Sequence, residues 1–141
     1  PSRLSLELTD SILLDDIDCV REELHQLVDM GVNLSIDDFG TGYSSLSYVK
    51  RMPVSVLKID QSFVRNVHKD VNDAAIVRAI ITLGHSLNLK IVAEGVESPE
   101  QVAKLLAEKC DVLQGYLFGR PMPYAAFIDH LTGGQVERKF A

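Results

Sequence analysis

Apolar and polar residues alternate along five short segments, and between these segments apolar residues recur every three or four positions. Alternation with a period of two predicts strands, and the longer period predicts amphipathic helices. We expect strands at residues 4–9, 32–39, 56–60, 90–96 and 112–118. We expect helices at residues 16–30, 73–87, 98–109 and 123–131, a short helix that ends before Pro53, and a polar tail at 133–141.

Strict alternation of strands and helices favours an α/β fold built on a parallel sheet. The pattern leaves two architectures open, a doubly wound sheet and a TIM-type (β/α) barrel. A complete barrel takes ~250 residues, so a chain of 141 residues would hold about five of its eight βα units. In the helix at 73–87 we expect the core-facing residues to be Ile76, Ala79, Ile80 and Leu83.

The composition narrows the classes of function. Hydrophobic residues make up 46% of the chain and charged residues 24%, which supports a packed core and excludes wholesale disorder. The net charge of −6 and the lack of a basic run disfavour DNA and anionic membranes as partners. No apolar run reaches the ~18 residues of a membrane span, so we expect no direct membrane insertion by this segment.

Two cysteines, Cys19 and Cys110, lie far apart and outside any CxxC pattern, as expected of buried thiols in a reducing compartment. We therefore expect the chain to be cytoplasmic, whether or not the parent protein is anchored in a membrane. The chain begins without methionine at a strand-like segment, which suggests a fragment or a processed product. The histidines show no metal-ligand spacing and are expected at the surface or at helix ends: His25, His68, His85 and His130.

Each predicted strand carries a polar residue of one parity near its C-terminal end. Parallel strands bring such groups together at one mouth of the sheet or barrel. We therefore expect one face to carry Ser5, Glu7, Ser35, Asp37, Lys58, Asp60, Glu94 and Gln114. The opposite face, against the helices, should carry Leu6, Leu34, Ile36, Ile59 and Ile91.

The clustered carboxylates predict a site for hard divalent cations. Glu7, Asp37, Asp38 and Glu94 offer only oxygen ligands, which select Mg²⁺ or Mn²⁺ over zinc or copper. With Asp37 bridging and Asp38 reaching a second ion, the site would suit two-metal phosphoryl displacement. Lys58 would then be the fixed charge that holds the attacking water or the phosphate. The alternative is a buried salt-bridge network of Lys58 with Asp37 and Glu94 and no metal.

A glycine-punctuated loop follows the two aspartates directly. It lacks the GK[ST] of a Walker A loop and the third glycine of a dinucleotide fingerprint. Its position after two strand-end acids favours a lid or switch.

Five segments in order resemble the EAL-domain family of cyclic di-GMP phosphodiesterases, over essentially the whole chain. They are Glu7-Leu8-Thr9, Asp37-Asp38-Phe39-Gly40-Thr41-Gly42-Tyr43-Ser44-Ser45-Leu46, Lys58-Ile59-Asp60, Val92-Ala93-Glu94-Gly95-Val96-Glu97, and Gln114-Gly115-Tyr116 through Arg120-Pro121. The resemblance implies a modified TIM barrel and Mg²⁺- or Mn²⁺-dependent hydrolysis of cyclic di-GMP to linear pGpG in bacterial second-messenger signalling.

The resemblance also assigns roles to individual residues. Glu7 and Asp37 would be ligands of the first metal, and Asp37 and Asp38 of the second. Lys58 and Glu94 would orient or deprotonate the attacking water. Asp60 and Glu97 would support the groups around that water, and Gln114 would line the same pocket.

The loop resembles the family's regulatory loop, which couples the metal site to dimerisation. Its residues would be Phe39, Gly40, Thr41, Gly42, Tyr43, Ser44 and Ser45, anchored by Asp10, where the family usually has glutamate. The resemblance therefore implies a homodimer, with sensory or GGDEF-type domains upstream in the parent protein.

The chain departs from the family pattern at its start. The family's Glu-Ala-Leu motif, a phosphate-binding arginine and an asparagine metal ligand would lie upstream, so residues 1–132 would be a partial EAL domain. We expect this fragment alone to be inactive. For the parent protein, the retained acids and lysine favour an enzyme over the alternative, a non-catalytic cyclic di-GMP receptor or dimerisation scaffold.

Overall fold

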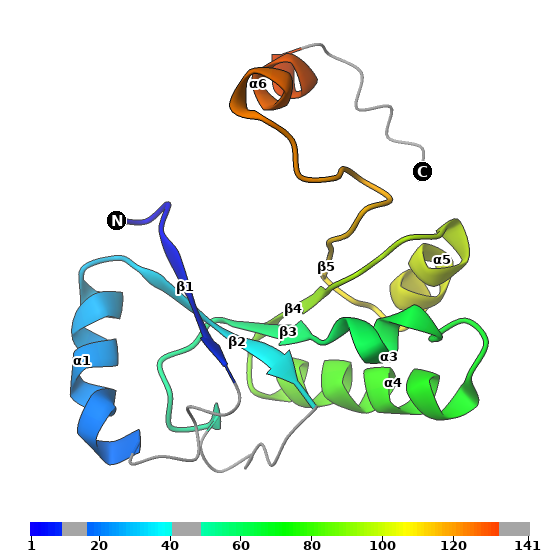
Figure 1. Ribbon diagram of the computed structural model, residues 1–141. Helices are drawn as coiled ribbons and strands as arrows, with labels where there is room; N and C mark the ends of the chain where they lie inside the picture. The colour runs from blue at the N-terminus through cyan, green and yellow to red at the C-terminus, as the bar shows by residue number, and fades with distance from the viewer. Residues whose placement is uncertain (10–16, 41–48, 133–141) are drawn as a thin grey trace.

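Five parallel strands form one sheet whose order follows the chain (Figure 1). The computed structural model describes residues 1–9, 17–40 and 49–132. Its strands are β1 (Ser5–Thr9), β2 (Asn33–Phe39), β3 (Val56–Ile59), β4 (Lys90–Ala93) and β5 (Val112–Leu113). Doubly wound sheets reverse their strand order at a switch point. The order β1-β2-β3-β4-β5 has no reversal, so the fold is part of a TIM-type barrel.

Helices lie between β1 and β2, between β3 and β4 and between β4 and β5, and a last helix follows β5. They are α1 (Ile17–Asp29), α3 (Gln61–Arg65), α4 (Val71–Ser86), α5 (Pro99–Ala107) and α6 (Tyr124–Thr132). The predicted short helix before Pro53 falls largely on residues outside the described part. No described helix is both long enough and apolar enough to cross a membrane.

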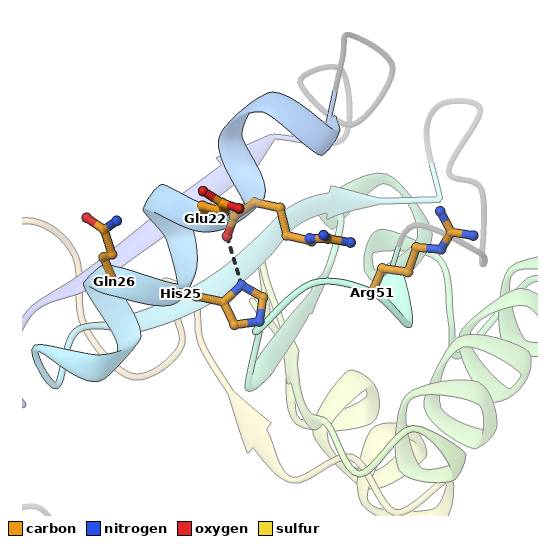
Figure 2. A pocket seen from close by; sticks show the side chains of 5 residues that line it. Glu22, His25, Gln26 and Arg51 are labelled. Carbon is orange, nitrogen blue, oxygen red and sulfur yellow. Dashed lines mark hydrogen bonds between the residues drawn. The ribbon is translucent and has the colours of Figure 1, made fainter.

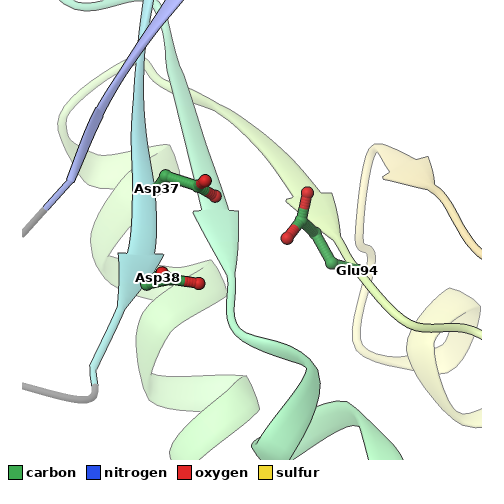
Figure 3. A group of neighbouring side chains, drawn as sticks. All are labelled: Asp37, Asp38 and Glu94. Carbon is green, nitrogen blue, oxygen red and sulfur yellow. The ribbon is translucent and has the colours of Figure 1, made fainter.

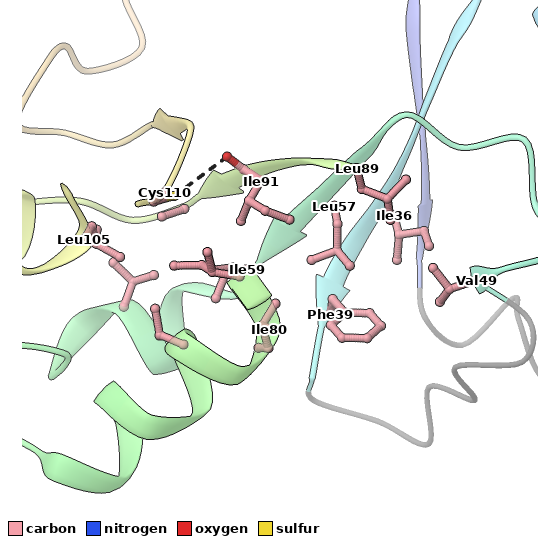
Figure 4. Close-up of a cluster of buried hydrophobic side chains, with 14 of the residues drawn as sticks. Ile36, Phe39, Val49, Leu57, Ile59, Ile80, Leu89, Ile91, Leu105 and Cys110 are labelled. Carbon is pink, nitrogen blue, oxygen red and sulfur yellow. Dashed lines mark hydrogen bonds between the residues drawn. The ribbon is translucent and has the colours of Figure 1, made fainter. Parts of the chain in front are cut away.

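The hydrophobic core lies between the sheet and the helices (Figure 4). Leu34, Ile36, Ile59 and Ile91 face it from three neighbouring strands and are completely buried, as the alternation predicted. Leu6 is the exception, with 37% of its surface exposed, because its strand β1 is at the edge of the described sheet and has only β2 beside it.

Helix α4 covers the middle of the sheet with a face that differs from the predicted one. Its buried residues are Ala74, Val77, Ile80, Ile81 and Gly84. The prediction is confirmed for Ile80 and for the half-buried Leu83, which packs against the core, but it is wrong for Ile76 and Ala79, which are exposed. Apolar residues occur nearly all around this helix, so their period does not select one face.

Two features shorten the predicted strands and add a helix. Gly95 adopts a φ of +68°, a conformation that favours glycine, and the chain leaves β4 two residues before it. The side chain of Asp60 accepts a hydrogen bond from the backbone N–H of Ser62 and thereby starts α3, which the sequence pattern did not predict. As predicted, Ser98 opens α5, where it forms a capping box with Gln101.

Cys110 is buried and three of the four histidines are exposed, as predicted. Cys110 is a buried free thiol, and burial raises the pKa of this thiol. The side chain of Cys19 lies outside the described part. His25, His85 and His130 are exposed as predicted, whereas His68 is half-buried.

Candidate metal and substrate site

Lys58 of β3 is the centre of a cluster to which three other strands contribute acids. Its Nζ lies 2.7 Å from Glu7 Oε1 on β1. The same Nζ lies 3.0 Å from Asp37 Oδ1 on β2 and 2.7 Å from Glu94 Oε1, which directly follows β4. The predicted convergence at the carboxyl edge of the sheet is therefore confirmed for these four residues.

The cluster carries more negative than positive charge. Burial lowers the pKa of Lys58, but hydrogen bonds to Glu7, Glu94 and Asp37 outweigh it and hold that pKa above its usual value. One ammonium cannot neutralise three carboxylates, so the site favours a further cation. In addition, Asp37 Oδ1 is buried, and its partner among the described residues is Lys58 Nζ.

Asp37 and Asp38 reach the site together because β2 is irregular where they lie. Consecutive residues of a regular strand point to opposite faces. The register between β2 and β3 shifts between Ile36 and Phe39, and Asp38 adopts a φ of +53°. Both aspartate side chains consequently project toward Glu94 (Figure 3).

Asp37, Asp38 and Glu94 form a group that fits a divalent cation. One ligand oxygen from each residue lies within 4.8 Å of the others. The donors are all carboxylate oxygens, which suit Mg²⁺, Mn²⁺ or Ca²⁺. The group contains two of the three predicted metal ligands, Asp37 and Asp38, but it has Glu94 in place of Glu7, so the predicted ligand set stays a prediction.

Asp60 lies beside this group and has a second role as the cap of α3. Burial raises the pKa of Asp60, but hydrogen bonds from the hydroxyl and the backbone N–H of Ser62 lower it below its usual value. Asp38 is affected in the opposite direction, because burial, Asp37 and Asp60 all raise its pKa. A cation near Asp38 would relieve this repulsion.

A cavity of about 240 Å³ adjoins Glu94 on the side of β5. Glu97 and Gln114 line it. The family resemblance implies that Gln114 lines the substrate pocket and that Glu97 supports the groups around the attacking water, and these roles stay predictions. Gln61 and Tyr116 line it as well, and sequence reasoning did not predict them. Gln61 could have been predicted from its position directly after Asp60, because the residues that follow the end of a barrel strand line the same end of the barrel.

A larger hollow of about 660 Å³ lies along α1, away from the carboxylate cluster (Figure 2). His25 Nδ1 lies 2.8 Å from the carbonyl oxygen of Arg21, which can only accept, so Nδ1 carries the proton. The wall combines Arg51 with Glu22 and contains no converging acids. This hollow therefore lacks the chemistry of the cluster around Lys58.

A family model described as "EAL domain" matches residues 1–121. The chain belongs to the EAL domain family. It is 57% identical over 123 residues to the "bifunctional diguanylate cyclase/cyclic di-GMP phosphodiesterase MucR" of Pseudomonas aeruginosa, covering 87% of this chain and 18% of MucR. The chain thus spans less than a fifth of that relative.

Solved EAL structures superpose closely on this chain. The structure titled "PaMucR Phosphodiesterase, c-di-GMP complex" has a TM-score of 0.85 and 55% identity over 90% of this chain and 51% of that chain. A manganese and cyclic di-GMP complex of Klebsiella pneumoniae BlrP1 has a TM-score of 0.79 and 36% identity over 86% of this chain and 31% of that chain. The TIM-barrel fold implied by the resemblance is therefore confirmed.

The structure places only part of the predicted regulatory loop of this EAL domain. Phe39 is 5% exposed and belongs to the hydrophobic core, so its ring anchors the start of the loop. Gly40 follows with a φ of +103°, next to the ring of Phe63. Asp10 and the residues from Thr41 to Ser45 lie outside the described part, and their predicted role stays a prediction.

Proposed function

We propose that the protein carrying this EAL domain hydrolyses one phosphodiester bond of cyclic di-GMP and releases linear pGpG. The observation that carries the proposal is the convergence of Glu7, Asp37 and Glu94 on Lys58, with Asp38 alongside. The similarity to MucR, a relative named as a cyclic di-GMP phosphodiesterase whose structure is a cyclic di-GMP complex, supports the choice of substrate.

The proposed cofactor is Mg²⁺ or Mn²⁺, held by Glu7, Asp37 and Asp38. A bound divalent cation polarises a phosphoryl oxygen and makes a water molecule a better nucleophile at neutral pH. The carboxylate cluster supports this assignment, since it supplies only hard oxygen donors.

Lys58 and Glu94 would act on the attacking water. Lys58 Nζ is held at 2.7 Å from Glu94 Oε1, which keeps both side chains in a fixed mutual geometry. Glu94, with 19% of its side chain exposed, can accept the proton of a water molecule in the adjoining cavity. Lys58 can donate a hydrogen bond to the water or to a phosphate oxygen.

Asp60, Glu97 and Gln114 complete the proposed site. Asp60 would support Asp38, and Glu97 and Gln114 would contact the substrate in the cavity beside Glu94. We also propose that the domain works as a homodimer in the cytoplasm, coupled through the loop at residues 39–45, with sensory or GGDEF-type domains in the parent protein.

The test is turnover of cyclic di-GMP by the intact protein, with product analysis in Mg²⁺ and a binding titration in Ca²⁺. Formation of pGpG supports the proposal. Binding without turnover would indicate a receptor, and the absence of both binding and turnover would indicate a scaffold. We expect no turnover by the isolated 141-residue chain.

Replacing Asp37 by asparagine removes a bridging anionic ligand and should lower the rate by about 10²-fold or more. Asp29→Asn, at the exposed end of α1, is the matched control and should leave the rate unchanged. Activity of Asp37→Asn within about tenfold of wild type at saturating Mg²⁺ would show that Asp37 is not a bridging ligand.

A further inference from the structure

Gln61 and Gln101 lie on neighbouring helices but use their carboxamides differently. Gln101 is 4% exposed, and its Oε1 accepts hydrogen bonds from the backbone N–H groups of Glu97 and Ser98. Its Nε2 donates to the carbonyl oxygen of Arg65 at 3.1 Å. Gln61 is exposed, and its carboxamide makes no hydrogen bond to any residue of the described part. Gln101 therefore has a structural role, whereas the carboxamide of Gln61 is available to a ligand.

The backbone beneath Gln61 is fixed at both ends of the short helix that it opens. At the start of α3, Asp60 accepts a hydrogen bond from the backbone N–H of Ser62 at 2.9 Å. At the end of α3, the carbonyl oxygen of Arg65 is held by Gln101. Because this backbone is already fixed, the Gln61 side chain can bind a ligand with little loss of backbone entropy.

The side chain of Gln61 crosses the chain immediately after Glu94. A Cβ atom added to Gly95 would lie 2.6 Å from Gln61 Cβ and 3.5 Å from Gln61 Oε1. Glycine at this position therefore lets Gln61 lie against the backbone. As a result Gln61 lines the cavity next to Glu94 and a second one of about 240 Å³ beside it.

The chemistry of the cavity beside Glu94 suits a nucleobase better than a phosphate. The carboxylates of Glu94 and Glu97 repel an anion, whereas the carboxamides of Gln61 and Gln114 offer donors and acceptors together. The ring of Tyr116 is half exposed at the same cavity, and aromatic rings stack on bases of any sequence.

We infer that Gln61 binds a guanine base of the cyclic dinucleotide through its carboxamide and so contributes to substrate recognition. This inference rests on the proposed function, because it assigns part of the same substrate to the cavity beside Glu94. Guanine presents both donor and acceptor atoms on its Watson–Crick edge, and one carboxamide can engage two of them.

The test uses Gln61→Met in the intact protein, since methionine keeps the length of the side chain across Gly95 and loses only the carboxamide. We expect the KM for cyclic di-GMP to rise about tenfold with kcat within about threefold of wild type, as for loss of one bidentate base contact. The Kd for cyclic di-GMP in Ca²⁺ should rise by the same factor. Gln26→Ala, an exposed glutamine on α1, is the control and should change neither value.

A base-free substrate, bis(p-nitrophenyl) phosphate, separates base recognition from damage to the metal centre. Its hydrolysis should be unchanged in Gln61→Met. An unchanged KM and Kd for cyclic di-GMP, or an equal loss on both substrates, would overturn the role of Gln61 while leaving the proposed function standing. Failure of the wild-type protein to bind cyclic di-GMP at all would overturn both.

Discussion

Replacing Lys58 by methionine would remove the ammonium that pairs with the carboxylates of Glu7, Asp37 and Glu94. Methionine keeps a long unbranched side chain in the space of the lysine stem, so the packing of β3 is largely preserved. What changes is the charge, because Glu7, Asp37 and Glu94 lose the ammonium that lies 2.7, 3.0 and 2.7 Å from them. The variant therefore measures how much the chain depends on that ammonium.

The cost follows from how deeply each partner is buried. The Lys58 side chain is 9% exposed, and those of Asp37 and Glu94 are each 19% exposed, so these two pairs are close to buried ones. Removing one partner of a buried pair costs about 3–5 kcal/mol. Glu7 is 51% exposed and contributes as a surface pair, with roughly 0.2–1 kcal/mol. Because water still reaches both buried acids, we take about 3 kcal/mol, the low end of the buried range.

A loss of this size lowers the melting temperature of a chain of this length by roughly 10 °C. The assay is thermal unfolding followed by circular dichroism, first with a chelator and then with saturating Mg²⁺. Mg²⁺ should raise the melting temperature of Lys58→Met more than that of wild type, because in this variant the ion binds carboxylates that have lost the Lys58 ammonium. Lys50→Met replaces an exposed lysine and should behave as wild type. A melting temperature of Lys58→Met within about 2 °C of wild type under chelation would contradict the reasoning.

Two further predictions concern the helices that cover the sheet. Gly84→Ala places a methyl group on α4 where it overlaps the side chain of Ile91. We therefore expect urea unfolding to show a free energy of unfolding lower by about 1–3 kcal/mol. An unchanged midpoint would mean that the helix can shift away. Hydrogen bonds from Arg78 and Lys104 lower the pKa of Glu108 to about 2. The contribution of Glu108 to stability is therefore fully present above its unfolded pKa near 4.5 and is lost as the pH falls toward 2. The stability difference between wild type and Glu108→Gln should shrink over that range, and a difference independent of pH would refute the pairing.

The convergence of the strand-end residues could be predicted because it depends only on the two-residue alternation along each strand and on parallel pairing. Alternation along a strand decides which residues share a face, and parallel pairing brings equivalent ends together. The pairing of Leu57 with Ile91 and of Lys58 with Val92 keeps β3 and β4 in a simple register, which places Lys58 next to Glu94. No unusual backbone is needed at these positions.

The position of Asp38 could not be derived in this way. Strand periodicity places it on the helix-facing side, and only the register shift of β2 and the positive φ of Asp38 bring it to Asp37. Such an irregularity results from contacts with a neighbouring strand, which local patterns do not encode. The short helix α3 was missed for a related reason, since a single turn started by Asp60 has too few residues to show a period.

The strand order of the sheet has a consequence for how this chain is made. Because β1 to β5 lie side by side in the order in which they are synthesised, the preceding strand has already emerged from the ribosome when each of β2 to β5 emerges. Domains generally fold as synthesis proceeds from the N-terminus, and closely spaced contacts reduce the loop closure needed at each step. The nascent EAL chain can therefore add one βα unit at a time during translation.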